Sequence, residues 1–103
     1  MNDLLVWLQN YYQAQCDGEW EHQHGFSIDN VDNPGWCVKF DLEHTEVENL
    51  PFEGVKDMRT ENDWIICFVE NKIFRGSGGP QNLTEILTVF RRWVESSGSP
   101  TPG

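Results

Sequence analysis

One stretch near the middle of the chain alternates between apolar and mostly polar residues, the pattern of a strand with one buried face. The apolar positions are Trp36, Val38, Phe40 and Leu42, and the residues between and after them are Cys37, Lys39, Asp41 and Glu43. Such a strand is stable only within a sheet whose apolar face is covered by another layer. The rest of the sequence must therefore supply partner strands and a cover.

Partner strands are predicted on both sides of this segment. Phe26 and Ile28 alternate with polar residues, and the sequence from Asp32 to Gly35, DNPG, is a strong turn signal. Residues 24–30 are therefore expected to form a hairpin with the alternating strand. An acidic, irregular stretch follows over 43–51. Beyond it we expect a weak strand over 55–59, a central strand buried on both faces over 64–69, a short strand over 73–75 and a flexible loop over 76–80.

Both ends of the chain carry the helical spacing needed to cover the sheet. Residues 3–15 and the segment that begins at Asn82 place apolar residues three and four positions apart. Asn82 with Glu85 three residues later is typical of a capped helix start. The sequence thus predicts an α+β fold, in which an antiparallel four- to five-stranded meander sheet packs against N-terminal and C-terminal helices.

A length of 103 residues fits one domain with one core. We expect this domain to span residues 1–96, and the Ser-, Gly- and Pro-rich residues 97–103 to form a disordered tail. No apolar run is long enough for a transmembrane helix, and no signal peptide is visible. Cys16, Cys37 and Cys67 show neither disulfide nor zinc-binding spacing, so reduced thiols in a cytoplasmic protein are expected.

The net charge of −10 is unevenly distributed. Residues 1–50 hold ten acidic residues and one basic residue, whereas residues 51–103 hold seven acidic and six basic residues. Binding to nucleic acid or to an anionic membrane requires clustered Lys and Arg, so both are disfavoured. A basic protein would be attracted. The alternative is that the charge only keeps the domain soluble.

The densest polar cluster follows the first predicted helix and allows a metal site. His22 and His24 would point to the same side of an extended segment. Further ligands could come from Asp17, Glu19 and Glu21. This arrangement would suit a small metal-dependent enzyme, although no distant His or Cys stands out as another ligand. No phosphate- or dinucleotide-binding motif is present, and no cofactor is expected.

The same cluster also allows a protein-recognition surface. Carboxylates around an exposed Trp20 would form an aromatic anchor ringed by charge, a common feature of protein interfaces. Trp20 could instead belong to the core, with the acidic residues in a solvated loop. Both interpretations of Trp20 remain open at the level of the sequence.

Four short blocks occur in order along the chain. They are YQAQCDGEWEH over residues 12–22, DNPGW over 32–36, ENDW over 61–64 and GGPQNL over 78–83. Together they resemble the signature of the bacterial immunity protein 53 family, across about residues 11 to 95. The sequence departs from that pattern at Tyr11, where Trp is expected, and at Val31, where Leu is usual.

This resemblance implies a cytosolic antitoxin of a polymorphic toxin system, encoded beside its toxin. Such a protein binds the toxin domain and blocks its active site or substrate surface, and it is not expected to be an enzyme. Nucleases are common among such toxins and are often basic, which suits the acidic half of this chain. The implied partner is a cognate toxin domain.

The matching residues fall into two groups. Turn and loop determinants are expected at Gly18, Pro34, Gly35, Gly79 and Pro80, and Asn82 is expected to cap a helix. Polar residues of the blocks that lack such a simple role, together with Trp20, are the predicted partner-binding residues. They are Asp17, Glu19, Trp20, Glu21, His22, Asp32 and Asn33.

Overall fold

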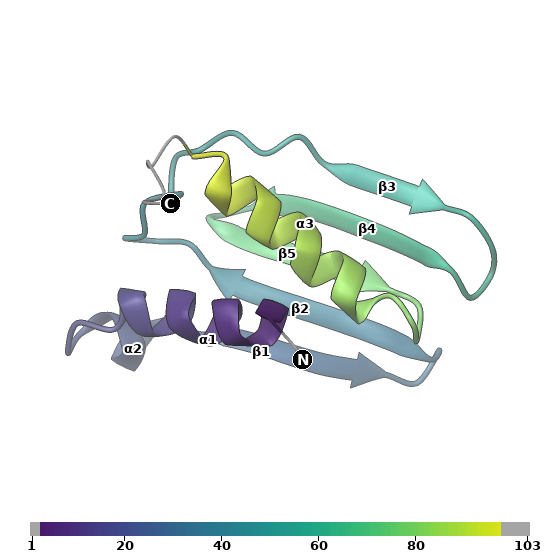
Figure 1. The fold of residues 1–103 in the computed structure, drawn as a ribbon, viewed down its shortest axis with the longest axis horizontal. Coiled ribbons are helices and arrows are strands. Elements are labelled where there is room, and N and C mark those ends of the chain that lie inside the picture. Colours follow the sequence, from purple (N-terminus) through teal and green to yellow (C-terminus); the bar gives the residue numbers. More distant parts are fainter. Residues whose placement is uncertain (1–2, 98–103) are drawn as a thin grey trace.

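Two long helices lie on the same side of a five-stranded sheet (Figure 1). The computed structural model describes residues 3–97, so the predicted tail lies outside the described residues except for Ser97. The helices are α1 (Asp3–Gln15), α2 (Trp20–Gln23) and α3 (Leu83–Glu95). The strands are β1 (Phe26–Val31), β2 (Gly35–Asp41), β3 (Val55–Met58), β4 (Trp64–Glu70) and β5 (Ile73–Gly78). Among these described helices, none is both long and apolar enough to cross a membrane.

All neighbouring strands of the sheet are antiparallel, and their order is β1-β2-β5-β4-β3. This confirms the predicted α+β class, but a simple meander is not the strand order. The sheet consists of two units, β1-β2 and β3-β4-β5, and within each unit strands that are consecutive in sequence pair with each other. The two units join where β2 pairs with β5, and loop 42–54 carries the chain to the far edge.

The core forms where α1 and α3 cover the sheet. Phe40, Phe74 and Phe90 are completely buried, and their rings lie 4.7–5.9 Å apart between centroids. Burying each such side chain contributes about 1.5–3 kcal/mol. From α1, the ring of Tyr11 packs edge-on against Phe90 at 5.6 Å. The apolar stripe of α3 predicted from the sequence is therefore the one that faces the sheet.

Strand β5 continues through the glycines that the sequence analysis assigned to a flexible loop, and that assignment is wrong. A Cβ atom on Gly76 would lie 2.5 Å from Cγ2 of Ile86, and one on Gly78 would lie 2.9 Å from the carbonyl oxygen of Trp64. The glycines therefore let α3 pack directly on the central strand. Composition alone cannot separate this role from that of a linker.

Strand β4 lies inside the sheet between β5 and β3, but only one of its faces is buried, so the prediction of burial on both faces is wrong. Ile65 and Cys67 are 2% and 1% exposed beneath the helices, whereas Phe68 on the other face is 40% exposed. Strand alternation places one residue set on the face that the described elements leave uncovered, here called the open face. From β4 and β3 it carries Trp64, Ile66, Phe68, Glu70, Lys56 and Met58, from β5 Ile73, Arg75 and Ser77, and from β1 and β2 Ser27, Asp29, Val31, Cys37, Lys39 and Asp41.

Candidate partner-binding surface at the acidic end

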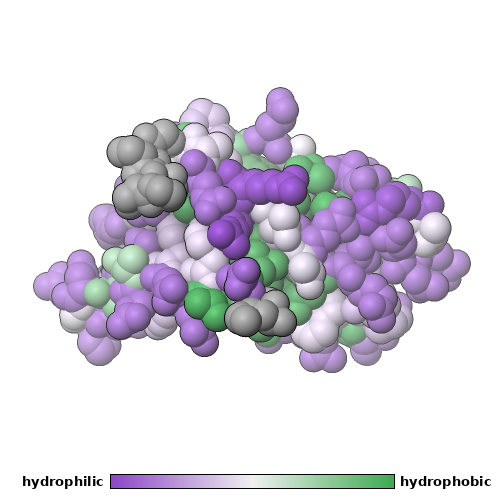
Figure 2. Space-filling model, viewed as in Figure 1, coloured by the Kyte–Doolittle hydropathy of each residue, from purple (hydrophilic) through white to green (hydrophobic). Residues whose placement is uncertain are grey.

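Three connections meet at one end of the sheet: loop 16–25, loop 42–54 and the turn between β4 and β5 (Figure 1). The Trp20 indole N–H donates to the Glu43 carbonyl at 2.8 Å, and the Leu42 N–H donates to the Lys72 carbonyl at 2.8 Å. We call this region the acidic end. With the adjoining ends of β2 and β4, its charged residues other than histidine are Asp17, Glu19, Glu21, Asp41, Glu43, Glu46, Glu48, Glu53 and Glu70, with Lys72 as the basic residue. From the helix side, hydrophilic side chains gather at both ends of the sheet (Figure 2).

The loop before α2 is held together by its own carboxylates. Asp17 Oδ1 accepts hydrogen bonds from the backbone N–H groups of Glu19 and Trp20, both at 2.9 Å. The bond from Trp20, followed by the bond from Glu19, lowers the pKa of the Asp17 carboxyl. The Glu21 carboxylate accepts from the N–H groups of Asp17 and Gly18 at 2.9–3.2 Å. Gly18, with φ of +97°, supplies the positive backbone angle that this turn requires. Asp17 and Glu21 thus have local structural roles that the sequence analysis did not assign.

Trp20 is buried, with 5% of its surface exposed. Its ring makes edge contacts with Tyr12 and Phe26 at 6.0 and 5.9 Å between centroids. Together with its hydrogen bond to Glu43, these contacts make Trp20 a link between the two loops. Trp20 is therefore a core residue, and the expectation that it is an exposed aromatic anchor is wrong.

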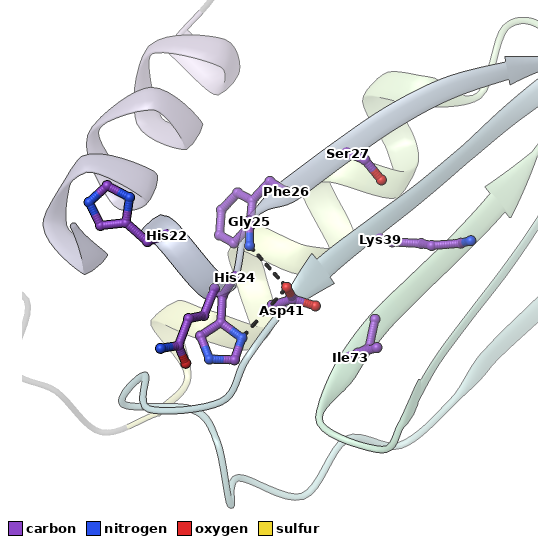
Figure 3. A pocket seen from close by; sticks show the side chains of 9 residues that line it. His22, His24, Gly25, Phe26, Ser27, Lys39, Asp41 and Ile73 are labelled. Carbon is purple, nitrogen blue, oxygen red and sulfur yellow. Dashed lines mark hydrogen bonds and ion pairs between the residues drawn. The ribbon is translucent and has the colours of Figure 1, made fainter. Parts of the chain in front are cut away.

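His22 and His24 do not form a metal-binding pair. His22 lies in the helix α2 instead of an extended segment, and His24 follows the end of that helix, so the two side chains project in different directions (Figure 3). His24 Nδ1 lies 3.8 Å from Oδ2 of Asp41, and the Gly25 N–H donates to the same oxygen at 2.9 Å. Within residues 3–97, no group of three or more His, Cys, Asp or Glu side chains could hold a metal ion.

Loop 42–54 presents carboxylates on a fixed backbone. Val47 is fully buried, and the Thr45 hydroxyl donates to the Leu42 carbonyl at 2.7 Å. Glu48 accepts a hydrogen bond from Lys72 at 3.0 Å, which is the main cause of its lowered pKa. Glu46 is exposed on this loop. The sequence showed that this stretch is acidic, but not that it folds beside α2.

The predicted site residues divide between two distant places. Asp17, Glu19, Glu21 and His22 lie at the acidic end. Asp32 and Asn33 lie in the exposed turn between β1 and β2, at the opposite end of the sheet. The length of β1 separates them, roughly 17–20 Å at about 3.3 Å per residue. The structure therefore does not unite the seven residues in one site.

Nearly the whole chain matches one known protein family. The family model described as immunity protein 53 matches residues 5–95. The chain belongs to the immunity protein 53 family. No curated protein and no solved structure matches it. The resemblance read from the four blocks is thereby confirmed.

Three of the four immunity protein 53 blocks meet at the end of the sheet opposite the acidic end. The Trp36 indole N–H donates to the Pro80 carbonyl at 3.0 Å. The Asn82 amide oxygen accepts from the Trp64 N–H at 3.3 Å, and its NH₂ group donates to Asp63 at 2.9 Å. Asn82 occupies the N-cap position of α3 but makes no side-chain capping bond, which corrects the expected role. These block residues fix the fold.

Arg59 reinforces that joint and was missed by the sequence analysis. It forms ion pairs at 2.7 Å with Asp57, Asp63 and Glu85, which link the β3-β4 hairpin to the first turn of α3. Its hydrogen bonds are the leading cause of the lowered pKa values of Asp63 and Glu85. Asp57 and Asp63 are near Arg59 in sequence, but Glu85 lies 26 residues away, so no local pattern predicted the link to α3.

Proposed function

We propose that this immunity protein binds its cognate toxin through the acidic end and thereby covers a basic surface of that toxin in the cytoplasm. The single observation that carries the proposal is the gathering of carboxylates from loops 16–25 and 42–54 and the adjoining strand ends, with Lys72 as the basic residue among them. A toxin that binds nucleic acid needs a positive surface, and a preformed negative surface would compete for it. The proposed action is binding, without catalysis.

Glu19 and Glu46 are the carboxylates best suited to meet a partner. Both are exposed, and neither forms an ion pair with any residue in the 3–97 range. The carboxylates of Asp17 and Glu21 instead accept hydrogen bonds from the backbone of their own loop. Direct contact is therefore proposed for Glu19 and Glu46, and a supporting role for Asp17 and Glu21.

The test is binding and rescue with the toxin domain encoded beside this protein. The double variant Glu19→Lys, Glu46→Lys is expected to weaken binding on the order of tenfold at low salt, because both steering and contact are lost. The wild-type affinity should fall as salt rises, and the variant should show a smaller salt effect. Cells that express the variant should be less protected from the toxin.

A matched control separates the acidic end from total charge. Asp3 and Glu61 are exposed and lie outside the acidic end, at the start of α1 and in the β3-β4 turn. The double variant Asp3→Lys, Glu61→Lys makes the same charge change and should retain most of the affinity. An equal loss of toxin affinity in both double variants would show that total charge matters and that the acidic end is not a specific contact surface. A wild-type protein that does not bind the toxin would remove the proposal altogether.

A further inference from the structure

The open face of the sheet carries two cations side by side in a protein of net charge −10. Lys39 of β2 and Arg75 of β5 are direct cross-strand partners. Like charges in this position repel each other and destabilise a sheet. Such a pair is therefore unfavourable in the free protein unless an anion lies nearby.

Asp29 and Asp41 also lie on this face, but within residues 3–97 neither forms an ion pair with Lys39 or Arg75. Lys39 is exposed and forms no ion pair with any described residue between positions 3 and 97. Arg75 has only a long contact, with its Nε 3.8 Å from the Glu70 carboxylate. That Nε is buried and has no hydrogen-bond partner among residues 3–97, so it is closed to an outside group. The Arg75 side chain is nevertheless 31% exposed, and its Nη groups form no ion pair with those residues, so they keep hydrogen-bonding capacity that an external carboxylate could use.

An apolar stripe begins directly beside the cations. Phe68 is the cross-strand partner of Arg75 on β4 and is 40% exposed. The stripe continues along β4 through Ile66 and Trp64 to Met58 of β3, which is 55% exposed. Aromatic residues and Arg together are the composition typical of interface centres. The open face therefore offers an anion-binding pair next to an apolar surface.

The open face is continuous with the acidic end. A hollow of about 500 Å³ is lined by residues of both, with His24 and Asp41 on one side and Ser27, Lys39 and Ile73 on the other (Figure 3). A protein seated on the acidic end can extend across this hollow without leaving the surface. A second copy of the chain is a poorer occupant, because it would bring another net charge of −10.

We propose that the open face is a second contact region for the same toxin, and that it receives an acidic side chain of the toxin on Lys39 and Arg75 and an apolar side chain on Phe68. This inference rests on the proposed function and extends it to an interface with two regions of opposite charge. The acidic end attracts the basic surface of the toxin, and the open face selects the toxin that carries an acidic group at the right place.

The sign of one charge reversal tests this inference. Lys39→Glu makes the protein more negative, so general attraction to a basic toxin would leave its affinity unchanged or raise it. The open-face contact instead predicts at least a tenfold loss of affinity, since a carboxylate of the toxin would meet another carboxylate. Arg92→Glu is the matched control, because Arg92 is exposed on α3, on the other side of the sheet.

The apolar contact has its own pair of variants. Phe68→Ser is expected to weaken binding to the neighbouring-gene toxin domain at least tenfold. Val6→Ser, at a residue 50% exposed on α1, should leave the affinity within about twofold. Circular dichroism and urea unfolding would establish that the variants are folded, and light scattering would give the mass of each free protein.

Each outcome separates the two proposals. If the wild-type protein binds the toxin and both Lys39→Glu and Phe68→Ser bind equally well, the open-face inference is wrong while the proposed function stands. If the free wild-type protein is a dimer that these substitutions dissociate, a second copy occupies the face and the inference is also wrong. If the wild-type protein does not bind the toxin, the proposed function itself fails.

Discussion

Asn82 is predicted to stabilise the fold as a tertiary hydrogen-bond partner and not as a helix cap. Its side chain is buried, with 5% exposed, and its amide oxygen accepts from the Trp64 N–H at 3.3 Å. Replacement by alanine removes that acceptor. Leaving a buried donor unsatisfied costs about 1–3 kcal/mol. The Asn82 NH₂ group also donates to Asp63 at 2.9 Å and to Glu85 at 3.1 Å, but losing these bonds adds little, because both carboxylates are substantially exposed and still pair with Arg59.

Urea unfolding measures this loss. Asn82→Ala should lower the free energy of unfolding by about 1–3 kcal/mol with an unchanged denaturant slope. With a slope of about 1–3 kcal/mol per molar urea, the midpoint falls by roughly 1 M. A signal from circular dichroism suits the assay, since it follows the whole fold.

Asn82→Ser decides between the two roles. Serine is among the best N-cap residues. Its hydroxyl, however, is one bond closer to the backbone than the amide oxygen that meets the Trp64 N–H. We therefore expect the serine variant to be nearly as destabilised as the alanine variant. A serine variant as stable as the wild type would show that helix capping is the contribution of Asn82 and would refute the reasoning.

Two further predictions concern packing and acid stability. Gly76→Ala should lower the free energy of unfolding by about 1–3 kcal/mol, because the new methyl group would lie 2.5 Å from Ile86. Gly25→Ala should be nearly neutral, because a methyl group there has no atom within 4 Å. Equal urea midpoints for both variants would contradict this prediction. Arg59→Met should destabilise the protein at neutral pH. Arg59 lowers the pKa of Asp63 in the folded protein. The pair therefore contributes its full stability above the unfolded pKa of Asp63, near 3.8, and that stability is lost as the pH falls through the lower folded pKa. The gap in urea midpoint between Arg59→Met and the wild type should thus narrow in acid, and a constant gap would count against the ion pair.

Local patterns predicted the elements of this fold well. Strict alternation in β2 and the apolar spacing in α1 and α3 correspond directly to what each element buries, so their positions could be read from the chain. The glycines of β5 are the instructive failure. Glycine is needed in β5 because Ile86 of α3 approaches the strand closely, and the residues next to these glycines in sequence do not reveal that contact.

The candidate surface was only partly predictable, because it is assembled from separate loops. The cluster around Glu19 was visible as a run of acidic residues, and so was the stretch around Glu46. Their meeting depends on the hydrogen bond from Trp20 to Glu43, which links positions 23 residues apart. The length of β1 makes Asp32 remote, and the strand order makes Lys39 and Arg75 adjacent. Pairing of β2 with β5 has no local signal in either strand.

The seam between β2 and β5 divides the molecule into two halves of successive chain. One half is α1, α2, β1 and β2, and the other is β3, β4, β5 and α3. Within each half, strand pairing is between neighbours in sequence and requires only short loop closures. Joining the halves requires closure of the chain between Asp41 and Ile73, the innermost pair of the seam. Folding is thus expected to proceed by early formation of two local units and a slower docking step, and Lys39 and Arg75 come together only in that last step.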